Sequence, residues 1–290
     1  MTLFVPLHVG TADPTGPLHS DWTLEPTVVL GLLTLVGAYL WATRAGRTQG
    51  GIRPVSGGQR AAFLGAVLTL FLALGPPLDD WSDHYLLTAH MVQHLLLTML
   101  APPLLLLGTP AWLLRPLLRW RLVARAGWLL TRPLVAFALA NAVFIAWHLP
   151  QLYEAALRVE ILHVIEHGLF LGTALLAWWP IVGPLLEWPR LSPPLQCAYL
   201  AAQTVPGQIV GAFITLAAPG LYAPYGTAPR IFGLDLANDQ QIAGLLMWVV
   251  SGAVYLLLIT VIFFRWAGRQ EAADREQARH AATRPAGGRS

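Results

Sequence analysis

The sequence predicts an all-α polytopic membrane protein, a bundle of seven transmembrane helices, from its composition and from the length of its apolar segments. Hydrophobic residues make up 56% of the 290 positions and charged residues only 11%, whereas soluble domains carry about 25% charge. A membrane-spanning helix needs about 20 predominantly apolar residues. The apolar segments are too long and too uniform for barrel strands. A soluble all-α protein could not cover so many apolar helices with so little polar sequence.

Seven segments meet this requirement, and glycine, proline or charged residues interrupt the chain between them. They cover residues 26–43, 60–78, 84–114, 132–149, 160–181, 194–217 and 237–266. The chain is therefore expected to comprise an exposed N-terminal segment (1–25), a transmembrane domain (26–266) and a basic cytoplasmic tail (267–290). The polar, arginine-rich tail is expected to be partly disordered and to lie against the anionic inner leaflet.

The arginines predict the orientation of the bundle. All eighteen basic residues are arginine, and sixteen of them lie at 44–60, at 115–132, at 190 and from 265 onwards. With seven spans these positions share one side of the membrane, and only Arg158 and Arg230 fall on the other. The positive-inside rule then places the N-terminus outside and the C-terminus in the cytoplasm. Since topology explains the basic residues, they indicate no nucleic-acid partner.

Six of the nine histidines collect at the predicted outer end of three consecutive spans. They are His84, His90 and His94 at the start of the third span, His148 at the end of the fourth, and His163 and His167 at the start of the fifth. Two of the pairs are spaced i, i+4, which places both imidazoles on one helix face. Ionisable side chains are costly in lipid and mark functional sites there.

This histidine set predicts a shared metal or haem site in the outer third of the membrane. Imidazole is a good ligand for copper, zinc, iron and nickel, and two i, i+4 pairs on touching helices could offer four nitrogens to one ion. His148 could complete the coordination or hand the ion over. Each histidine alone could instead be hydrogen-bonded at the headgroup level.

Four further residues are candidates for a supporting shell. Glu166 could orient a ligand imidazole or pair with a polar neighbour such as Asn141. Asp239 and Gln240 open the seventh span on the same side, where Asp239 could also serve as a helix cap. Met91 lies among the histidines and would favour Cu(I) as a ligand, or it could only pack.

Several segments resemble the CtaG-like family of cytochrome c oxidase assembly factors, the polytopic seven-span bacterial type. They are 90–94 (His-Met-Val-Gln-His) with 101–104 and 108–110, 147–150 (Trp-His-Leu-Pro) with 152–157, 163–167 (His-Val-Ile-Glu-His) with 178–181, and 239–244 (Asp-Gln-Gln-Ile-Ala-Gly). The resemblance runs from about residue 60 to residue 266. An unrelated single-span copper chaperone that bears the same name depends on paired cysteines, whereas this chain has one, Cys197.

The resemblance implies a multi-pass protein of the bacterial plasma membrane that helps to mature a haem-copper oxidase, with copper as the inferred cargo. Its partners would be oxidase subunits or other oxidase assembly factors. The expected function is therefore that of a copper-handling chaperone without catalytic turnover. A b-type haem protein with axial histidines is the alternative. A membrane metalloenzyme is a third, since His163, Glu166 and His167 match an His-x-x-Glu-His metal motif.

Overall fold

The computed structural model describes residues 25–48 and 54–283, and within these ranges the chain is helical without a strand. The predicted all-α fold is confirmed. The predicted N-terminal segment 1–25 lies outside the described residues except for Glu25. The elements are α1 (Pro26–Thr48), α2 (Gly57–Leu74), α3 (Leu78–His84), α4 (Leu87–Leu95), η1 (Leu96–Leu100), α5 (Ala101–Gly108), α6 (Ala111–Leu114), η2 (Arg115–Arg119), α7 (Arg121–Leu130), α8 (Pro133–Trp147), α9 (Pro150–Arg158), α10 (Glu160–Val182), α11 (Pro193–Leu216), α12 (Ala223–Thr227), α13 (Leu236–Leu245), η3 (Leu246–Val250) and α14 (Ser251–Thr283).

The described residues hold six helices long and apolar enough to cross a membrane, and a seventh if α7 and α8 count as one span. The difference from the predicted seven concerns α8, which has 15 residues and is short for a span of about 20. Helices α7 and α8 pass the length requirement only together, and they are bent by 76° where Pro133 begins α8. The seven-span prediction therefore agrees with the structure if this bent pair crosses the membrane.

The predicted third span consists of α4, η1 and α5 in succession, with a π-helical turn in the middle. Pro102 and Pro103 lack the N–H groups that would bond the carbonyls of Thr98 and Met99. The carbonyl of Thr98 accepts a hydrogen bond from Trp178 Nε1 of α10 instead, at 2.8 Å. The carbonyl that the proline pair leaves without a partner in its own helix therefore links the third span to α10.

Two short helices occupy places where the sequence predicted span ends or loops. His84 is the last residue of α3, and a break separates it from α4, so the prediction that His84 belongs to the third span is wrong. The chain turns at Tyr85 and Leu86, where the backbone of Leu86 is extended and cannot continue the helix. Helix α9 begins at Pro150, and a proline favours the first turn of a helix.

Helices α11 and α13 approach closely because glycines face each other across their contact. A Cβ on Gly211 would lie 2.9 Å from the carbonyl oxygen of Gly244, and one on Gly244 would lie 2.6 Å from the backbone nitrogen of Thr215. Small residues permit such backbone approach in membrane bundles. This contact fixes α13, whose first turn carries Asp239 and Gln240.

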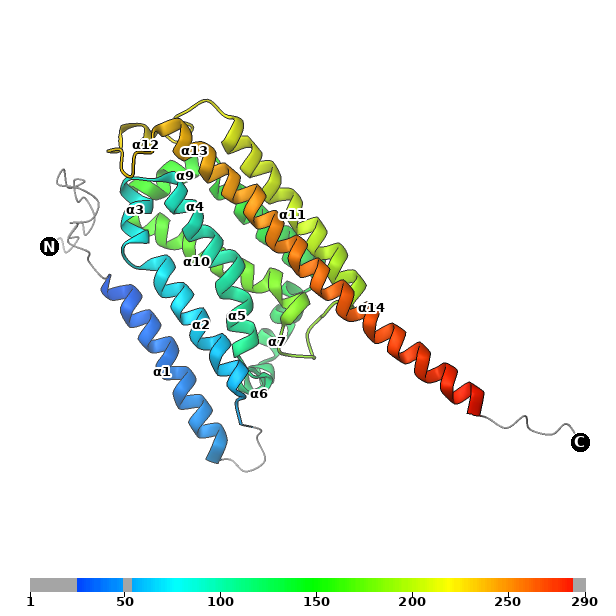
Figure 1. Cartoon of the computed structure of the whole chain (residues 1–290). Helices are drawn as coiled ribbons and strands as arrows, with labels where there is room; N and C mark the ends of the chain where they lie inside the picture. The colour runs from blue at the N-terminus through cyan, green and yellow to red at the C-terminus, as the bar shows by residue number, and fades with distance from the viewer. Residues whose placement is uncertain (1–24, 49–53, 284–290) are drawn as a thin grey trace, which may run out of the picture.

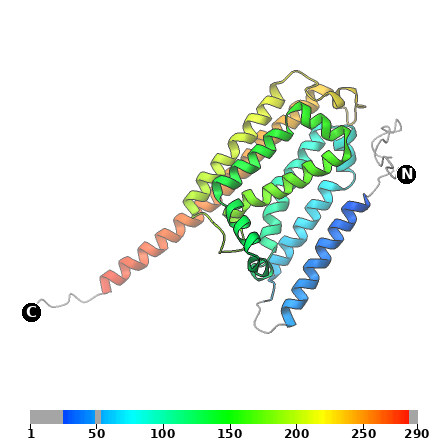
Figure 2. The same ribbon diagram turned by 180° about the vertical axis from the view of Figure 1, so that it is seen from behind.

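Helix α14 continues as one helix to Thr283, so the predicted tail is helical over residues 267–283, and residues 284–290 lie outside the described part of the chain. It extends beyond the bundle (Figure 1 and Figure 2). At the opposite end of the bundle α3, α9 and α12 gather, close to the start of α1 (Figure 1). Helix α7, which carries Arg121 and Arg125, lies away from that end (Figure 1).

Candidate metal centre

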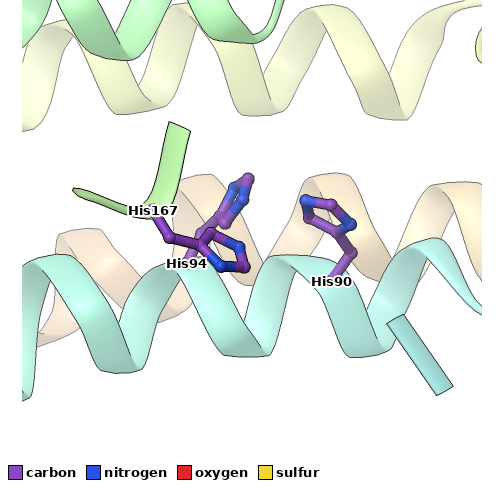
Figure 3. A group of neighbouring side chains, drawn as sticks. All are labelled: His90, His94 and His167. Carbon is purple, nitrogen blue, oxygen red and sulfur yellow. The ribbon is translucent and has the colours of Figure 1, made fainter. Parts of the chain in front are cut away.

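Five histidines from three helices form one contiguous cluster near the α3, α9 and α12 end of the bundle. His90 and His94 project from the same face of α4, and His167 reaches toward them from α10 (Figure 3). Ring centroids are 4.3 Å apart for His90 and His94, and 5.8 Å apart for His94 and His167. His163 lies 5.5 Å from His90, and His148, which ends α8, lies 5.5 Å from His94.

The cluster contains buried nitrogens without a hydrogen-bond partner among the described residues. All five histidines leave Nε2 unpaired, and His94 leaves Nδ1 unpaired as well. A buried polar atom without a partner costs about 1–3 kcal/mol, so these six nitrogens together destabilise the fold unless something binds them. A bound cation would accept lone pairs from several of them.

Hydrogen bonds to Nδ1 explain why Nε2 is the atom left free. The Tyr225 hydroxyl donates to the carbonyl of Ser82 at 2.6 Å and lies 3.1 Å from His90 Nδ1. Its single proton is used on Ser82, so His90 must donate from Nδ1 to the tyrosine oxygen. Burial raises the pKa of the Tyr225 phenol well above its ordinary value, which keeps that proton in place. In His148, Nδ1 donates to the Phe144 carbonyl at 2.7 Å.

The potential ligands form two groups of three that share one histidine. His90, His94 and His167 are one group, and Asp83, His90 and His163 are the other, with the ligand atoms of each group within 4.8 Å of one another. Nitrogens bound to one ion at about 2 Å lie at most about 4 Å apart. A contraction of about 1 Å would therefore close either group around an ion. The two i, i+4 pairs do not form one four-nitrogen set, because His163 falls in the second group.

Glu166 places an unpaired carboxylate beside the first group. Its Oε1 lies 3.6 Å from His94 Nε2, both side chains are almost fully buried, and both carboxylate oxygens lack a hydrogen-bond partner among the described residues. Asn141, the alternative partner considered from the sequence, donates instead to Gln203 Oε1 and to the Phe137 carbonyl. The carboxylate is thus available to an ion or to a ligand imidazole.

Asp239 anchors the helix that carries His90 and His94. Its carboxylate oxygens accept from the backbone N–H groups of Leu87 and Thr88, each at 2.9 Å, at the start of α4. The cap of its own helix is Asp235, which accepts from the Asn238 backbone. A carboxylate at a helix N-terminus satisfies free N–H groups and complements the helix dipole. Asp239 therefore fixes the position of α4 from another part of the chain.

The remaining predicted residues lie farther from the two groups. Gln240 accepts from the backbone of Gly220 and Leu221 and so holds the loop after α11. Met91 is fully buried in an apolar cluster that includes Tyr153 and Met247. His84 belongs to neither group of potential ligands, and its Nδ1 lies 3.2 Å from the Asp80 carbonyl in its own helix.

Sequence reasoning missed two residues of this centre, Asp83 and Tyr225. Asp83 Oδ2 lies 3.5 Å from His163 Nδ1, although the two residues are far apart in the chain. Its position directly before His84 was the available signal. Tyr225 carried no signal in its spacing, because its contact with His90 arises from the folding of the α12 loop over the end of the bundle.

These features define a class: a polytopic helical membrane protein with a buried cluster of histidines and carboxylates suited to a metal ion. Comparison with family models identifies the family. Residues 37–269 match the model described as cytochrome c oxidase caa3 assembly factor. The chain belongs to this family.

Curated relatives add sequence similarity without an assigned function. An uncharacterized protein of Mycobacterium bovis and an uncharacterized protein of Mycobacterium tuberculosis are each 23% identical over 276 residues. The match covers 90% of this chain and 41% of each relative, so the chain spans about two fifths of their length. No solved structure matches the chain.

Proposed function

We propose that this cytochrome c oxidase assembly factor binds a copper ion through His90, His94 and His167 and delivers it to the oxidase. The observation that carries the proposal is that His90, His94 and His167, each with an unpaired buried Nε2, offer ligand atoms that lie within 4.8 Å of one another. Imidazole ligands suit copper, and among divalent first-row metals Cu²⁺ binds nitrogen ligands most strongly. The oxidase that this family assembles is a haem-copper enzyme, which supplies a reason for copper as cargo.

His148 and Glu166 complete this proposal. His148 Nε2 is a fourth buried nitrogen, with its ring 5.5 Å from that of His94. Glu166 would contribute negative charge beside the ion, since a divalent cation among neutral imidazoles alone keeps its full charge in a dry site. The protein would hold and pass on the ion without catalytic turnover, and its partner would be an oxidase subunit or another assembly factor.

The distribution of arginines supports an outward-facing site in the bacterial plasma membrane. The start of α2, which carries Arg60, helix α7 and the C-terminal part of α14 lie away from the end of the bundle where α3, α9 and α12 gather (Figure 1). By the positive-inside rule the arginine-bearing end faces the cytoplasm. The histidine cluster would then open toward the outer face.

The geometry favours copper over haem and over metal-dependent catalysis. A haem between two axial imidazoles needs a planar gap, whereas Phe170 packs 4.6 Å from the His94 ring and Tyr153 packs 4.9 Å from the His90 ring. The histidines of the His-x-x-Glu-His motif, His163 and His167, belong to different ligand groups.

Purified protein in detergent tests the proposal directly. We expect one copper per chain by elemental analysis, no Soret band, and loss of copper in the double variant His90→Ala, His94→Ala. His84→Ala is the matched control, because this histidine lies at the same end but in neither ligand group. Unchanged copper content in the double variant, or a Soret band in the wild type, would contradict the proposal.

A further inference from the structure

The two ligand groups lie at successive depths in the bundle, because each helix contributes its histidines one turn apart. On α4, His90 comes first and His94 follows four residues later, and on α10 His163 precedes His167 in the same way. Four residues of helix advance by about 6 Å. The group of Asp83, His90 and His163 is therefore the outer one, and the group of His90, His94 and His167 is one turn deeper.

Exposure follows the same order. In the outer group two of the three side chains are partly exposed, Asp83 at 28% and His163 at 13%. In the deeper group only His167 is partly exposed, His94 is 1% exposed, and the shared His90 is fully buried. An ion that arrives from the end of the bundle thus meets Asp83 and His163 before the deeper histidines. Two more aspartates, Asp79 and Asp80, share α3 with Asp83, and a patch of one charge sign raises the local concentration of counter-ions.

His90 can serve only one group at a time. Its Nδ1 is engaged by the Tyr225 hydroxyl, so Nε2 is its single free lone pair. One nitrogen lone pair binds one ion. Full occupation of the outer group and full occupation of the deeper group are therefore alternatives, which is the arrangement expected for two successive positions of the same ion.

We propose that Asp83, His90 and His163 form an entrance site that binds the ion first, and that His90 then carries it to His94 and His167. The inference rests on the proposed copper binding and adds a route and an order to it. In the transfer the bonds from the ion to Asp83 and His163 break, bonds to His94 and His167 form, and the bond to His90 is kept. The oxidation state of the ion does not change.

The entrance site and the deeper site each have a carboxylate, so the ion would move between two sites of similar charge. Asp83 belongs to the entrance site, and Glu166 lies 3.6 Å from His94 at the deeper site. Because a carboxylate is available at both ends of the step, the ion need not pass through a position with only neutral ligands. Such a matched pair lowers the electrostatic cost of moving a cation inward.

The test compares the rate of copper loading with the final copper affinity, in full-length protein in detergent and with buffered Cu²⁺ as the probe. We expect Asp83→Asn and His163→Ala to slow loading at least about tenfold, with one copper per chain retained and little change in affinity. His167→Ala should do the reverse, with rapid capture and release to a chelator about tenfold faster or more. Asp80→Asn is the control for the loss of one acidic charge on α3 and should alter the loading rate far less than Asp83→Asn.

The outcomes separate this inference from the proposed function. A wild-type protein that binds no copper would remove the proposed function itself. A wild type that binds copper, together with an Asp83→Asn variant that loads at the wild-type rate, would overturn the entrance site alone. Two coppers per chain would also overturn it, because both positions would then be occupied together.

Discussion

Two buried polar regions of this bundle differ in whether their atoms satisfy one another. Midway along the bundle, Asn141 donates to Gln203 Oε1 at 2.8 Å, Gln203 donates to the Tyr199 hydroxyl at 3.1 Å, and Tyr199 donates to the Ala177 carbonyl at 3.1 Å. In the histidine cluster five Nε2 atoms have no such partner among the described residues. A closed network of this kind links helices to one another, whereas an open one leaves lone pairs for a ligand.

Among the residues that support the histidines, Glu166→Gln should have the largest effect on copper binding. The change keeps size and removes the negative charge beside His94, so copper affinity should fall about 10- to 100-fold. Competition against a copper chelator measures it. Glu154→Gln is the matched control, because its carboxylate pairs with Arg158 at the surface. Equal affinities for Glu166→Gln and wild type would show that the carboxylate does not face the ion.

Asp239→Ala should weaken copper binding through the position of α4. Two N–H groups at the start of α4 would lose their acceptor, at a cost of about 1–2 kcal/mol, and His90 and His94 would be held less firmly. Thermal unfolding and chelator competition should therefore both report a loss. Asp235→Ala removes the cap of α13 and should lower stability alone. A similar loss of affinity in both variants would mean that Asp239 has no special link to the histidines.

Tyr225→Phe should also weaken copper binding, by less than Asp239→Ala. Without the hydroxyl, His90 loses the acceptor for its Nδ1–H, so the free Nε2 is no longer held in one orientation. Loss of such a supporting contact lowers metal affinity about tenfold. Tyr199→Phe removes a hydroxyl from the closed network and should leave affinity unchanged. If both phenylalanine variants bind copper like the wild type, the Tyr225 contact does not orient the ligand.

Substitutions in the closed network of Asn141, Gln203 and Tyr199 should have the smallest effect on copper affinity and a clear effect on the free energy of unfolding. Asn141→Leu leaves Gln203 Oε1 without its donor and should cost about 1–3 kcal/mol, whereas Asn141→Leu with Gln203→Leu should recover much of this loss. Thermal unfolding in detergent measures both. Copper affinity should remain that of the wild type. A loss of copper affinity in either variant would show that the closed network also contributes to metal binding, and the two regions would then not differ in that respect.

Sequence patterns predicted the helices and most of the cluster, because both depend on regular spacing. Apolar runs defined the spans, and the i, i+4 histidines of α4 and α10 indicated which faces should meet. The contacts of Asp239 with Leu87 in α4 and of Tyr225 with His90 join positions 152 and 135 residues apart. Such contacts depend on how α13 and the α12 loop pack, and no local pattern encodes them.

The same limit explains the errors. His84 was grouped with His90 because an apolar stretch runs through both, but the extended backbone at Leu86 ends α3 and begins a new helix. The division of the histidines into two groups could not be predicted from the sequence either, because Asp83 contacts His163 only once the chain has folded. Spacing along one helix predicts a shared face, and it does not predict which lone pair is left free.

X-ray absorption of the copper-loaded wild-type protein tests the central claim most directly, namely that the unpaired imidazoles bind one ion. We predict a single copper environment with at least three imidazole nitrogens at about 2 Å. The imidazole signal should be lost when His90 and His94 are replaced by alanine. A spectrum without imidazole ligands, or one dominated by sulfur from methionine or Cys197, would contradict the account.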